Sequence, residues 1–346
     1  MQPAAAADRP LSMADVAARA GVSHQTVSRV VNGHPSVAPH TRERVEQAIA
    51  ELGYRPNIAA RALVTGSTTT IGLVTVKINQ YGPAQTMIGL EKAARAAGYS
   101  VSVSILDEAT AGAMRDAVDT FVAQRVDAIV ALTTYDDAAE ALGALEAPVP
   151  LVAVQVGGDE ERPAVGVDQL TGARLATRHL LDLGHRTVHH VAGPADSQEA
   201  RVRTRGWRAE LEAVGAPVPE HLRGDWTPSS GYAAGRQLAQ RIAAGEKITA
   251  VFLANDQMAL GLLAAFHESG IEAPDDVSVV GFDDLPEAPY FTPPLTTVRQ
   301  DFAELGRRGV QLVLARLQGE DLHPRAVPAE LVVRGSTGPA KVRGRT

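Results

Sequence analysis

The chain has 346 residues, of which 45% are hydrophobic and 21% charged, and it contains no cysteine. This length exceeds one ordinary core and predicts two or three domains, while the lack of cysteine excludes a disulfide framework and thiolate chemistry. No apolar run approaches the roughly 20 residues of a membrane span, and residues 1–10, expected to be disordered, lack the apolar core of a signal peptide, so we expect a cytoplasmic protein that does not contact a membrane.

The net charge of −7 is distributed unevenly along the chain. Residues 1–64 carry 7 basic and 5 acidic side chains, whereas the remainder carries 26 basic and 35 acidic ones. A local basic excess is the electrostatic footprint of a nucleic-acid-binding segment. The excess is small, so specific contacts and dimerisation must supplement charge.

Residues 13–32 are predicted to form two short helices with a break at Gly21. The hydroxyl of Ser23 can cap the second helix by accepting from its first-turn amides, and Asn32 with Gly33 can end it. Apolar side chains recur at helical spacing at Val16, Ala17, Ala20, Val27, Val30 and Val31. The opposite face of the second helix carries long hydrogen-bonding side chains, as a reader of the DNA major groove requires: His24, Gln25, Ser28 and Arg29.

A third helix is predicted from Pro39, which suits a first turn, to Gly53, which suits a helix end. Its apolar stripe at Val45, Ala48, Ile49 and Leu52 can close a small three-helix core. The Ala-rich run that follows, 57–64, is shorter than the about 12 residues that an isolated helix needs in water. It is either a linker or a helix that forms only when paired with its twin on DNA.

The motif Val-Ala-x-x-Ala-Gly-Val-Ser-x-x-Thr-Val-Ser-Arg-Val-Val-Asn, within residues 16–32, resembles the DNA-binding headpiece of the lactose repressor (LacI) family. Tyr-x-Pro-Asn-x-x-Ala-x-x-Leu resembles the hinge of that family, whose Leu wedges into the minor groove and kinks the duplex. His24 stands where galactoside-responsive members have a base-reading Tyr, which leaves the operator sequence open. The resemblance implies DNA contacts from Met13, Ser23, His24, Gln25, Thr26, Ser28, Arg29, Asn32, Thr41, Tyr54, Asn57 and Leu63.

From Thr70 onward, predicted strands and helices alternate, which indicates parallel sheets covered by helices on both faces. The first series has strands at 71–76, 101–106, 128–132 and 151–156 and helices at 84–97, 114–125 and 138–145. The second has helices at 170–183, 200–214, 232–243, 258–269 and 302–318 and strands at 188–192, 250–253 and 277–282, with a crossing strand at 296–299. Two such series predict two lobes with a cleft between them, in which ligands lie at the carboxyl ends of the strands.

The predicted fold is therefore α/β: a small all-α helix-turn-helix headpiece plus a two-lobed core of parallel sheets, like that of periplasmic binding proteins. The predicted boundaries are 1–10 for a disordered N-terminus, 11–55 for the headpiece, 56–69 for hinge helix and linker, 70–335 for the effector-binding and dimerisation core, and 336–346 for a flexible tail. Lobe 1 is expected over about 70–166 and 299–328, and lobe 2 over about 167–298 and 329–335.

Catalytic patterns are missing from the sequence. It has no phosphate-binding loop, no nucleophile elbow and no His-Glu-x-x-His motif. His189 and His190 are strand neighbours that point to opposite faces, which favours structural roles. Asp283 and Asp284 could serve acid catalysis or a metal, but such carboxylates equally accept hydrogen bonds from sugar hydroxyls. We therefore expect no enzyme, no cofactor and no metal.

Polar and aromatic residues follow several predicted strands. Together they provide the groups that bind a pyranose: planar hydrogen-bonding groups for its hydroxyls and an aromatic face for its C–H side. They are Arg203, Trp226, Asn255, Asp256, Asp283 and Gln300. Taken singly, Trp226 is more often a core residue and Arg203 a solvated helix residue. Their joint placement favours a sugar site.

Several core motifs resemble those of galactoside-responsive members of the same family, such as Ala-Asn-Asp-Gln-Met-Ala-Leu-Gly at 254–261 and Gln-Asp-Phe at 300–302. Gln155 and Glu199 depart from that pattern, because those members have a sugar-contacting Asp and a Ser there. The resemblance implies an effector site formed by Arg203, Trp226, Asn255, Asp283, Gln300 and Phe302, with Gln155, and bordered from the other lobe by Gly82, Pro83 and Thr86.

These observations predict a repressor that binds a pseudo-palindromic operator as a homodimer and is released by a sugar inducer, a galactoside by resemblance. The alternatives are a corepressor-type regulator, a solute-binding protein, which the headpiece and the missing signal peptide disfavour, and an enzyme, which no constellation supports. The sequence lacks the leucine-heptad helix that makes some relatives tetrameric. By resemblance, we expect the dimer interface on helix 84–97 and around Tyr290.

Overall fold

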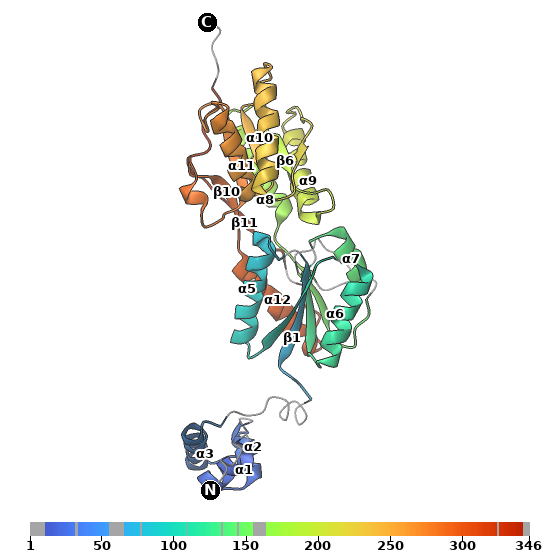
Figure 1. Ribbon diagram of the computed structural model, residues 1–346, viewed down its shortest axis with the longest axis vertical. Helices are drawn as coiled ribbons and strands as arrows, with labels where there is room; N and C mark the ends of the chain where they lie inside the picture. Colours follow the sequence, from blue (N-terminus) through green and yellow to red (C-terminus); the bar gives the residue numbers. More distant parts are fainter. Residues whose placement is uncertain are drawn as a thin grey trace, which may run out of the picture. The chain divides into compact units, whose positions relative to one another are not determined.

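The computed structural model describes residues 11–31, 34–54, 66–76, 78–108, 110–132, 134–143, 145–154, 164–323 and 325–341. The chain divides into two compact units, 1–68 and 69–346, and each is described by itself (Figure 1). Four residues with predicted site roles lie outside the described residues: Asn32, Asn57, Leu63 and Gln155.

The first unit is the predicted three-helix headpiece, with helices α1 (Met13–Ala20), α2 (His24–Val31) and α3 (Pro39–Leu52). Ser12 and Asp15 form a capping box at α1, and the hydroxyl of Ser23 accepts from the amide of Thr26 at 3.1 Å at the start of α2. The predicted apolar stripes meet in one core, in which the most buried side chains are Val16, Val27 and Val45. Apolar periodicity therefore identified this core directly.

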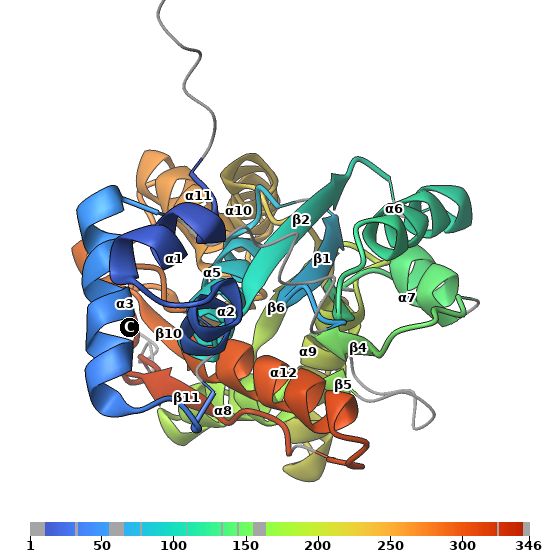
Figure 2. The same ribbon diagram turned by 90° about the horizontal axis from the view of Figure 1, so that it is seen from below.

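Lobe 1 of the second unit contains a five-stranded sheet of order β2-β1-β3-β4-β5 in which every pairing is parallel. Its strands are β1 (Thr70–Val76), β2 (Ser100–Leu106), β3 (Ala128–Leu132), β4 (Leu151–Val154) and β5 (Ala164–Val165). Figures 1 and 2 show α6 (Ala111–Ala123) and α7 (Asp136–Gly143) on one face, and α5 (Tyr81–Ala96) and α12 (Phe302–Leu317) on the other. Along β1, Leu73 packs on the α5–α12 side and Val74 on the α6–α7 side, as strand alternation requires.

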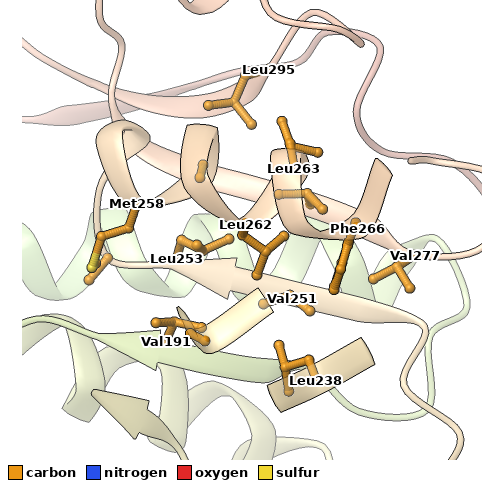
Figure 3. Close-up of a cluster of buried hydrophobic side chains, with 14 of the residues drawn as sticks. Val191, Leu238, Val251, Leu253, Met258, Leu262, Leu263, Phe266, Val277 and Leu295 are labelled. Atoms are coloured by element: carbon orange, nitrogen blue, oxygen red, sulfur yellow. The ribbon is translucent and has the colours of Figure 1, made fainter. Parts of the chain in front are cut away.

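Lobe 2 contains a six-stranded sheet of order β11-β10-β9-β8-β6-β7, parallel except for the β10–β11 pair. Its strands are β6 (His189–Ala192), β7 (Leu222–Arg223), β8 (Ala250–Leu253), β9 (Ser278–Asp283), β10 (Thr296–Gln300) and β11 (Ala329–Val332). Helices α10 (Pro228–Ala243) and α11 (Asp256–Glu268) cover one face, with the core shown in Figure 3, and α8 (Gln169–Asp182) and α9 (Gln198–Ala213) cover the other. The short β5, β7 and β11 and the 3-10 turn η1 (Ala288–Tyr290) were not predicted.

The chain crosses between the lobes after β10, enters lobe 1 as α12, and returns to lobe 2 as β11. Arg299 and Gln300 still pair within the lobe 2 sheet, with Asp283 and Ala329 respectively, so the predicted boundary at 299 falls two residues early. In lobe 1, α12 lies directly against α5. The two helices are so close that a Cβ atom added at Gly306 would overlap the backbone of Gly89. Two helices distant in sequence, α5 and α12, therefore pack together within lobe 1.

The predicted flexible tail from 336 does not fit the structure up to Lys341. Ser336 is fully buried: its hydroxyl donates to the carbonyl of Val279 at 2.6 Å and accepts from the amide of Thr296 at 2.8 Å. The amide of Ala340 bonds the carbonyl of Leu183 at 2.9 Å. The Ser, Gly and Pro composition suggested a loose segment, but these long-range hydrogen bonds attach it to lobe 2. Residues 342–346 lie outside the described part.

Among the residues that the structure describes, no helix has the length and apolarity needed to cross a membrane.

Candidate functional site

The outward face of α2 carries polar side chains, most of them in solvent. His24, Gln25 and Arg29 are exposed, and Ser28 is half-buried. The hydroxyl of Thr26 lies 2.9 Å from that of Ser23, so both belong to the helix cap. A helix with such a face can enter the major groove and offer hydrogen bonds to base edges.

The headpiece arginines differ in their partners within the described residues. Arg19 of α1 pairs with Glu51, Arg42 donates to the carbonyl of His34 at 2.9 Å, and Arg44 donates to the carbonyl of Gly21 at 3.2 Å. Those interactions hold α3 against the rest of the headpiece. Arg29 is exposed, and among the described headpiece arginines it is the one whose guanidinium forms no recorded hydrogen bond or ion pair within the described residues, so its donors can serve a ligand.

Two predicted DNA contacts also pack within the headpiece. Tyr54 is 6% exposed and belongs to the headpiece core, and the half-buried Met13 packs against the same core. Their DNA contacts stay predictions from family resemblance. Thr41 is half-buried, with its hydroxyl 3.1 Å from Nε2 of His40.

A second group of polar residues lines a cavity of about 30 Å³ between the two lobes. Lobe 1 contributes Gln80, Tyr81, Gly82, Pro83 and Phe302, and lobe 2 contributes Glu199, Arg203, Trp226, Asn255, Gln257, Asp283 and Gln300. The predicted residues Gly82, Pro83, Arg203, Trp226, Asn255, Asp283, Gln300 and Phe302 are thus brought together. Ligand pockets usually occupy about 300–1,000 Å³, so a sugar ring can enter only if the lobes or the lining side chains move.

Three buried hydrogen bonds and one ion pair join Arg203, Asp283 and Gln300, which line this cavity, into a closed loop through Gln169. Nε of Arg203 donates to Oε1 of Gln169 at 2.8 Å, whose amide nitrogen donates to Oε1 of Gln300 at 2.8 Å. The amide nitrogen of Gln300 donates to Asp283 at 2.7 Å, and that carboxylate lies 3.7 Å from Nη1 of Arg203. Such a network holds the charged groups in fixed orientations, because each member is held by its neighbours.

Arg203 is 3% exposed, so the interpretation of a solvated helix residue is wrong. Its guanidinium lies 3.8 Å from the ring centroid of Phe282 and 5.5 Å from that of Trp226, and Nη1 also donates to the carbonyl of Ala254. Planar guanidinium groups stack on aromatic faces in this way. Arg203 therefore supports the pocket structurally as well as lining it.

Trp226 is positioned by backbone geometry and by its neighbours. Its φ is 75°, and Asp283 and Asp284 also have positive φ, at 116° and 54°. Such non-glycine conformations persist where the surroundings enforce them, commonly at ligand sites. The side-chain amide of Asn255 donates to the carbonyl of Trp226 at 3.1 Å, and a Cβ atom added at Gly193 would overlap the indole ring.

The carboxyl groups of the pocket are shifted by burial. Desolvation raises the pKa of Asp283 to about 6 despite the nearby Arg203 and the hydrogen bond from Gln300. Desolvation also raises the pKa of Glu199 to about 7, with Arg203 opposing and Asp283 adding to the shift. Behind them Asp256 is fully buried, and desolvation together with the charge of Asp283 raises its pKa well above the ordinary value. It accepts from the hydroxyl of Thr297 at 2.5 Å and the amide of Leu285 at 2.9 Å.

The sequence predictions missed several residues of the pocket. Gln80 and Tyr81 precede the predicted Gly82-Pro83 pair, and their place at the start of a helix was the available signal. Gln257 lies within the motif at 254–261, and that motif was the signal for it. Thr86, in contrast, was expected at the cleft but is fully buried, with its hydroxyl donating to the carbonyl of Gly82 at 2.8 Å. Gln169, at the start of α8, had no local signal because its partners are distant in sequence.

A larger cavity of about 480 Å³ lies in the same unit, lined by Val76, Asp107, Glu108, Thr110, Ala111, Tyr135, Asp137, Glu140, Ala141 and Asp196. We place the site at the smaller cavity, because only there do aromatic rings and an oriented polar network converge. The hydroxyl of Tyr135 accepts from Nε2 of Gln80 at 2.6 Å, and so connects the linings of the two cavities.

His190, one of the two adjacent histidines, has a structural role. His190 is buried, stacks on Phe252 at 4.8 Å between ring centroids, and bonds the carbonyl of Phe252 at 2.9 Å. Burial lowers the pKa of His190 to about 3, so the ring stays neutral. Within the described ranges, no cluster of three or more His, Cys, Asp or Glu side chains could hold a metal ion.

A helix-turn-helix unit with an exposed polar helix face, joined in one chain to a two-lobed α/β core with a polar and aromatic cavity, defines a ligand-responsive DNA-binding regulator. Two family models match the chain: "Bacterial regulatory proteins, lacI family" over residues 12–57 and "Periplasmic binding protein-like domain" over residues 177–337. The chain belongs to the lacI family of bacterial regulatory proteins, as the sequence motifs predicted.

Full-length relatives support this membership. The lactose operon repressor of Escherichia coli (strain K12) is 37% identical over 95% of this chain and 91% of its own length. The regulator CelR of Thermobifida fusca is 38% identical over 93% of this chain and 96% of its own length. The chain is thus a DNA-binding transcriptional repressor with a sugar-type effector core, not an enzyme.

Solved structures agree in fold. A lac repressor dimer bound to operator and the anti-inducer ONPF has a TM-score of 0.85 at 36% identity and covers 95% of this chain and 100% of that one. A CelR–cellobiose complex has a TM-score of 0.70 at 34% identity and covers 94% of this chain and 99% of that one.

Proposed function

We propose that this repressor binds a pseudo-palindromic operator as a homodimer and is released when a sugar glycoside, a galactoside in the first instance, enters the cavity between its lobes. The observation that carries the proposal is the closed network from Arg203 through Gln169 and Gln300 to Asp283, beside Trp226 and Phe302. It offers oriented donors and acceptors for hydroxyl groups and aromatic faces for the C–H side of a pyranose. Because its target is chromosomal DNA, we place the protein in the cytoplasm.

On the DNA side, we propose that Gln25 and Arg29 read base edges and that His24 adjusts the sequence preference. The exposed face of α2 and the uncommitted guanidinium of Arg29 support this assignment. Ser23, Thr26, Ser28 and Thr41 are proposed as supporting contacts, and Asn32, Asn57 and Leu63 remain proposals from family resemblance.

Release requires that the sugar bind two core conformations unequally, since a ligand with equal affinity for both shifts nothing. The small volume of the cavity supports such a difference, because the described conformation must open before a ring fits. The two lobes contact each other beside the cavity, where the amide of Gln198 bonds the carbonyl of Thr134 at 3.0 Å and Arg201 pairs with Asp136. Breaking or shifting these contacts would change the orientation of one lobe relative to the other.

A glucoside such as cellobiose is the second candidate effector. It is favoured by the CelR–cellobiose complex among the structural neighbours and by Glu199, which departs from the galactoside-type pattern. A corepressor-type response, in which sugar strengthens DNA binding, is the remaining alternative.

The test is operator binding by fluorescence anisotropy during titration with galactosides, glucosides and free sugars. Asp283→Asn preserves size and tolerates positive φ, so it should bind operator like the wild type and lose sugar response. Asp137→Asn, in the larger cavity, is the matched control. Tighter operator binding with sugar would establish the corepressor alternative, and no response to any sugar would overturn the proposal.

The dimer is proposed to use α5 and the region around Tyr290. Tyr290 is 84% exposed and Ile88 of α5 is 40% exposed, and apolar side chains of this size in solvent suit an interface. Sedimentation at micromolar concentration should show a dimer. A stable monomer or tetramer would contradict this assignment.

A further inference from the structure

The side chain of Glu199 lies in the wall of the cavity between the lobes, one turn before Arg203 on α9. Within the described part of the chain, its carboxylate receives no hydrogen bond that the structure records. The other acid of the cavity, Asp283, is held by Gln300 at 2.7 Å. Glu199 is therefore a partly buried acceptor that faces the space a ligand would enter.

The charges of this cavity do not balance. Arg203 contributes one positive charge, and its Nε and Nη1 atoms are already engaged with Gln169 and Ala254. Asp283, 3.7 Å from Nη1 of Arg203, offsets that charge. Glu199 adds a further negative charge when it is ionised, so the cavity has an excess of one negative charge.

We propose that Glu199 is a specificity-determining residue, which accepts a hydrogen bond from a neutral or cationic sugar and excludes anionic sugars such as uronates from the effector site. The inference rests on the proposed sugar-responsive function and specifies its ligand class. A carboxylate accepts hydrogen bonds but cannot donate when ionised, and a second anion beside it in a partly buried site is repelled. A Ser at this position would impose no such exclusion.

The titration of Glu199 provides a signature that a packing role would lack. The groups that face it are Arg203 on its own helix, Asp283 at the end of β9, and the hydroxyl of Tyr135 from the loop after β3, with Asp256 of α11 behind Asp283. Burial raises the pKa of Glu199 to about 7. Exclusion of anions should therefore be strong at pH 8 and weaken at pH 6, where Glu199 is largely neutral.

The experiment is calorimetric titration of the full chain with methyl β-galactoside and methyl β-glucoside, each beside its uronate and its 6-amino-6-deoxy analogue. At pH 8 the wild type should bind the uronate about 100-fold more weakly than the neutral glycoside, the order expected for unit charges about 6 Å apart at an effective dielectric of about 20. Glu199→Gln should reduce that ratio at least about tenfold at pH 8 and leave only the smaller pH dependence that comes from Asp283, whose raised pKa is about 6. The cationic analogue should lose affinity in Glu199→Gln.

Asp137→Asn is the control, because it removes one negative charge without altering this cavity. If it changes the ratio as much as Glu199→Gln, the exclusion comes from overall charge and the proposal is wrong. Equal binding of uronate and neutral glycoside by the wild type also overturns it while leaving sugar response intact. Failure of every sugar to bind overturns both this inference and the proposed function. Glu199→Ser, a smaller side chain, must reproduce the result of Glu199→Gln.

Discussion

The outward face of α2 and the cavity between the lobes are both polar, but they obtain their function in opposite ways. The side chains of Gln25 and Arg29 stand in solvent and keep their hydrogen-bonding capacity for a ligand. Arg203 and Asp283 are 3% and 8% exposed, and much of their capacity is used inside the protein. An exposed recognition residue can thus be replaced without harm to the fold, whereas a buried one supports fold and function together.

Arg203→Ala should produce the largest effect, because it removes the cation that pairs with Asp283 and the donor groups that bond Oε1 of Gln169 and the carbonyl of Ala254. Removal of one member of a buried ionic group commonly costs about 3–5 kcal/mol, so the free energy of unfolding of the core should fall by that amount in urea denaturation. Arg201→Ala is the matched control on the same helix. Arg201 pairs with Asp136 at half-exposed positions, where a loss of about 1 kcal/mol or less is expected.

An equal loss in both arginine variants would show that the network around Arg203 is not a stabilising unit. Because Arg203 supports the fold as well as lining the cavity, Arg203→Ala would not report on sugar release alone. Asp283→Asn is the cleaner probe of release for that reason.

The pH dependence of stability should differ between the wild type and Asp283→Asn. The folded-state pKa of Asp283 is raised to about 6 from 3.8, so its contribution to stability is fully present below pH 3.8 and is lost as pH rises through 6. The stability difference, wild type minus variant, should therefore fall by about 2 kcal/mol between pH 4 and 7, at 1.36 kcal/mol per pKa unit. Urea denaturation across this range measures it, and a difference that rises with pH would contradict the assignment.

In the headpiece, Arg29→Ala should weaken binding to the cognate operator by about 1–3 kcal/mol and relax preference at one base pair. Its melting temperature should not change, because Arg29 has no recorded internal partner. Arg19→Ala is the control, since Arg19 pairs with Glu51 within the headpiece. Fluorescence anisotropy with cognate and scrambled DNA distinguishes the Arg29→Ala variant from the Arg19→Ala control. Unchanged specificity in Arg29→Ala would show that other residues read the bases.

Gly193→Ala should act on the cavity and leave the headpiece unchanged. The added methyl group overlaps the ring of Trp226, and such overpacking typically costs about 1–3 kcal/mol. We expect sugar affinity to fall with operator affinity retained. Gly112→Ala, where nothing lies within 4 Å, is the matched control and should be neutral. Retained sugar affinity in Gly193→Ala would show that the position of Trp226 is not critical.

The sequence by itself determined the headpiece, because its signals are local. Each of the three helices has its own apolar stripe, with Val16, Val27 and Val45 as members. These stripes and the cap at Ser23 depend on neighbours within a few turns of the same helix. The alternation of strands and helices in the core is equally local, so two parallel-sheet lobes could be predicted. Even the residues that end the strands of lobe 2, such as Asp283, were identified in this way.

Only the tertiary structure decided how the cavity works. Gln169 and Gln300 are 131 positions apart, yet their side chains meet at 2.8 Å. The burial of Arg203, the raised pKa of Glu199 and the attachment of Ser336 arise likewise from segments distant in sequence. Periodicity reports which face of an element is buried, but not which polar groups meet there. That depends on how the sheets and helices of the core pack, and this packing gives the cavity its charge and its hydrogen-bond network.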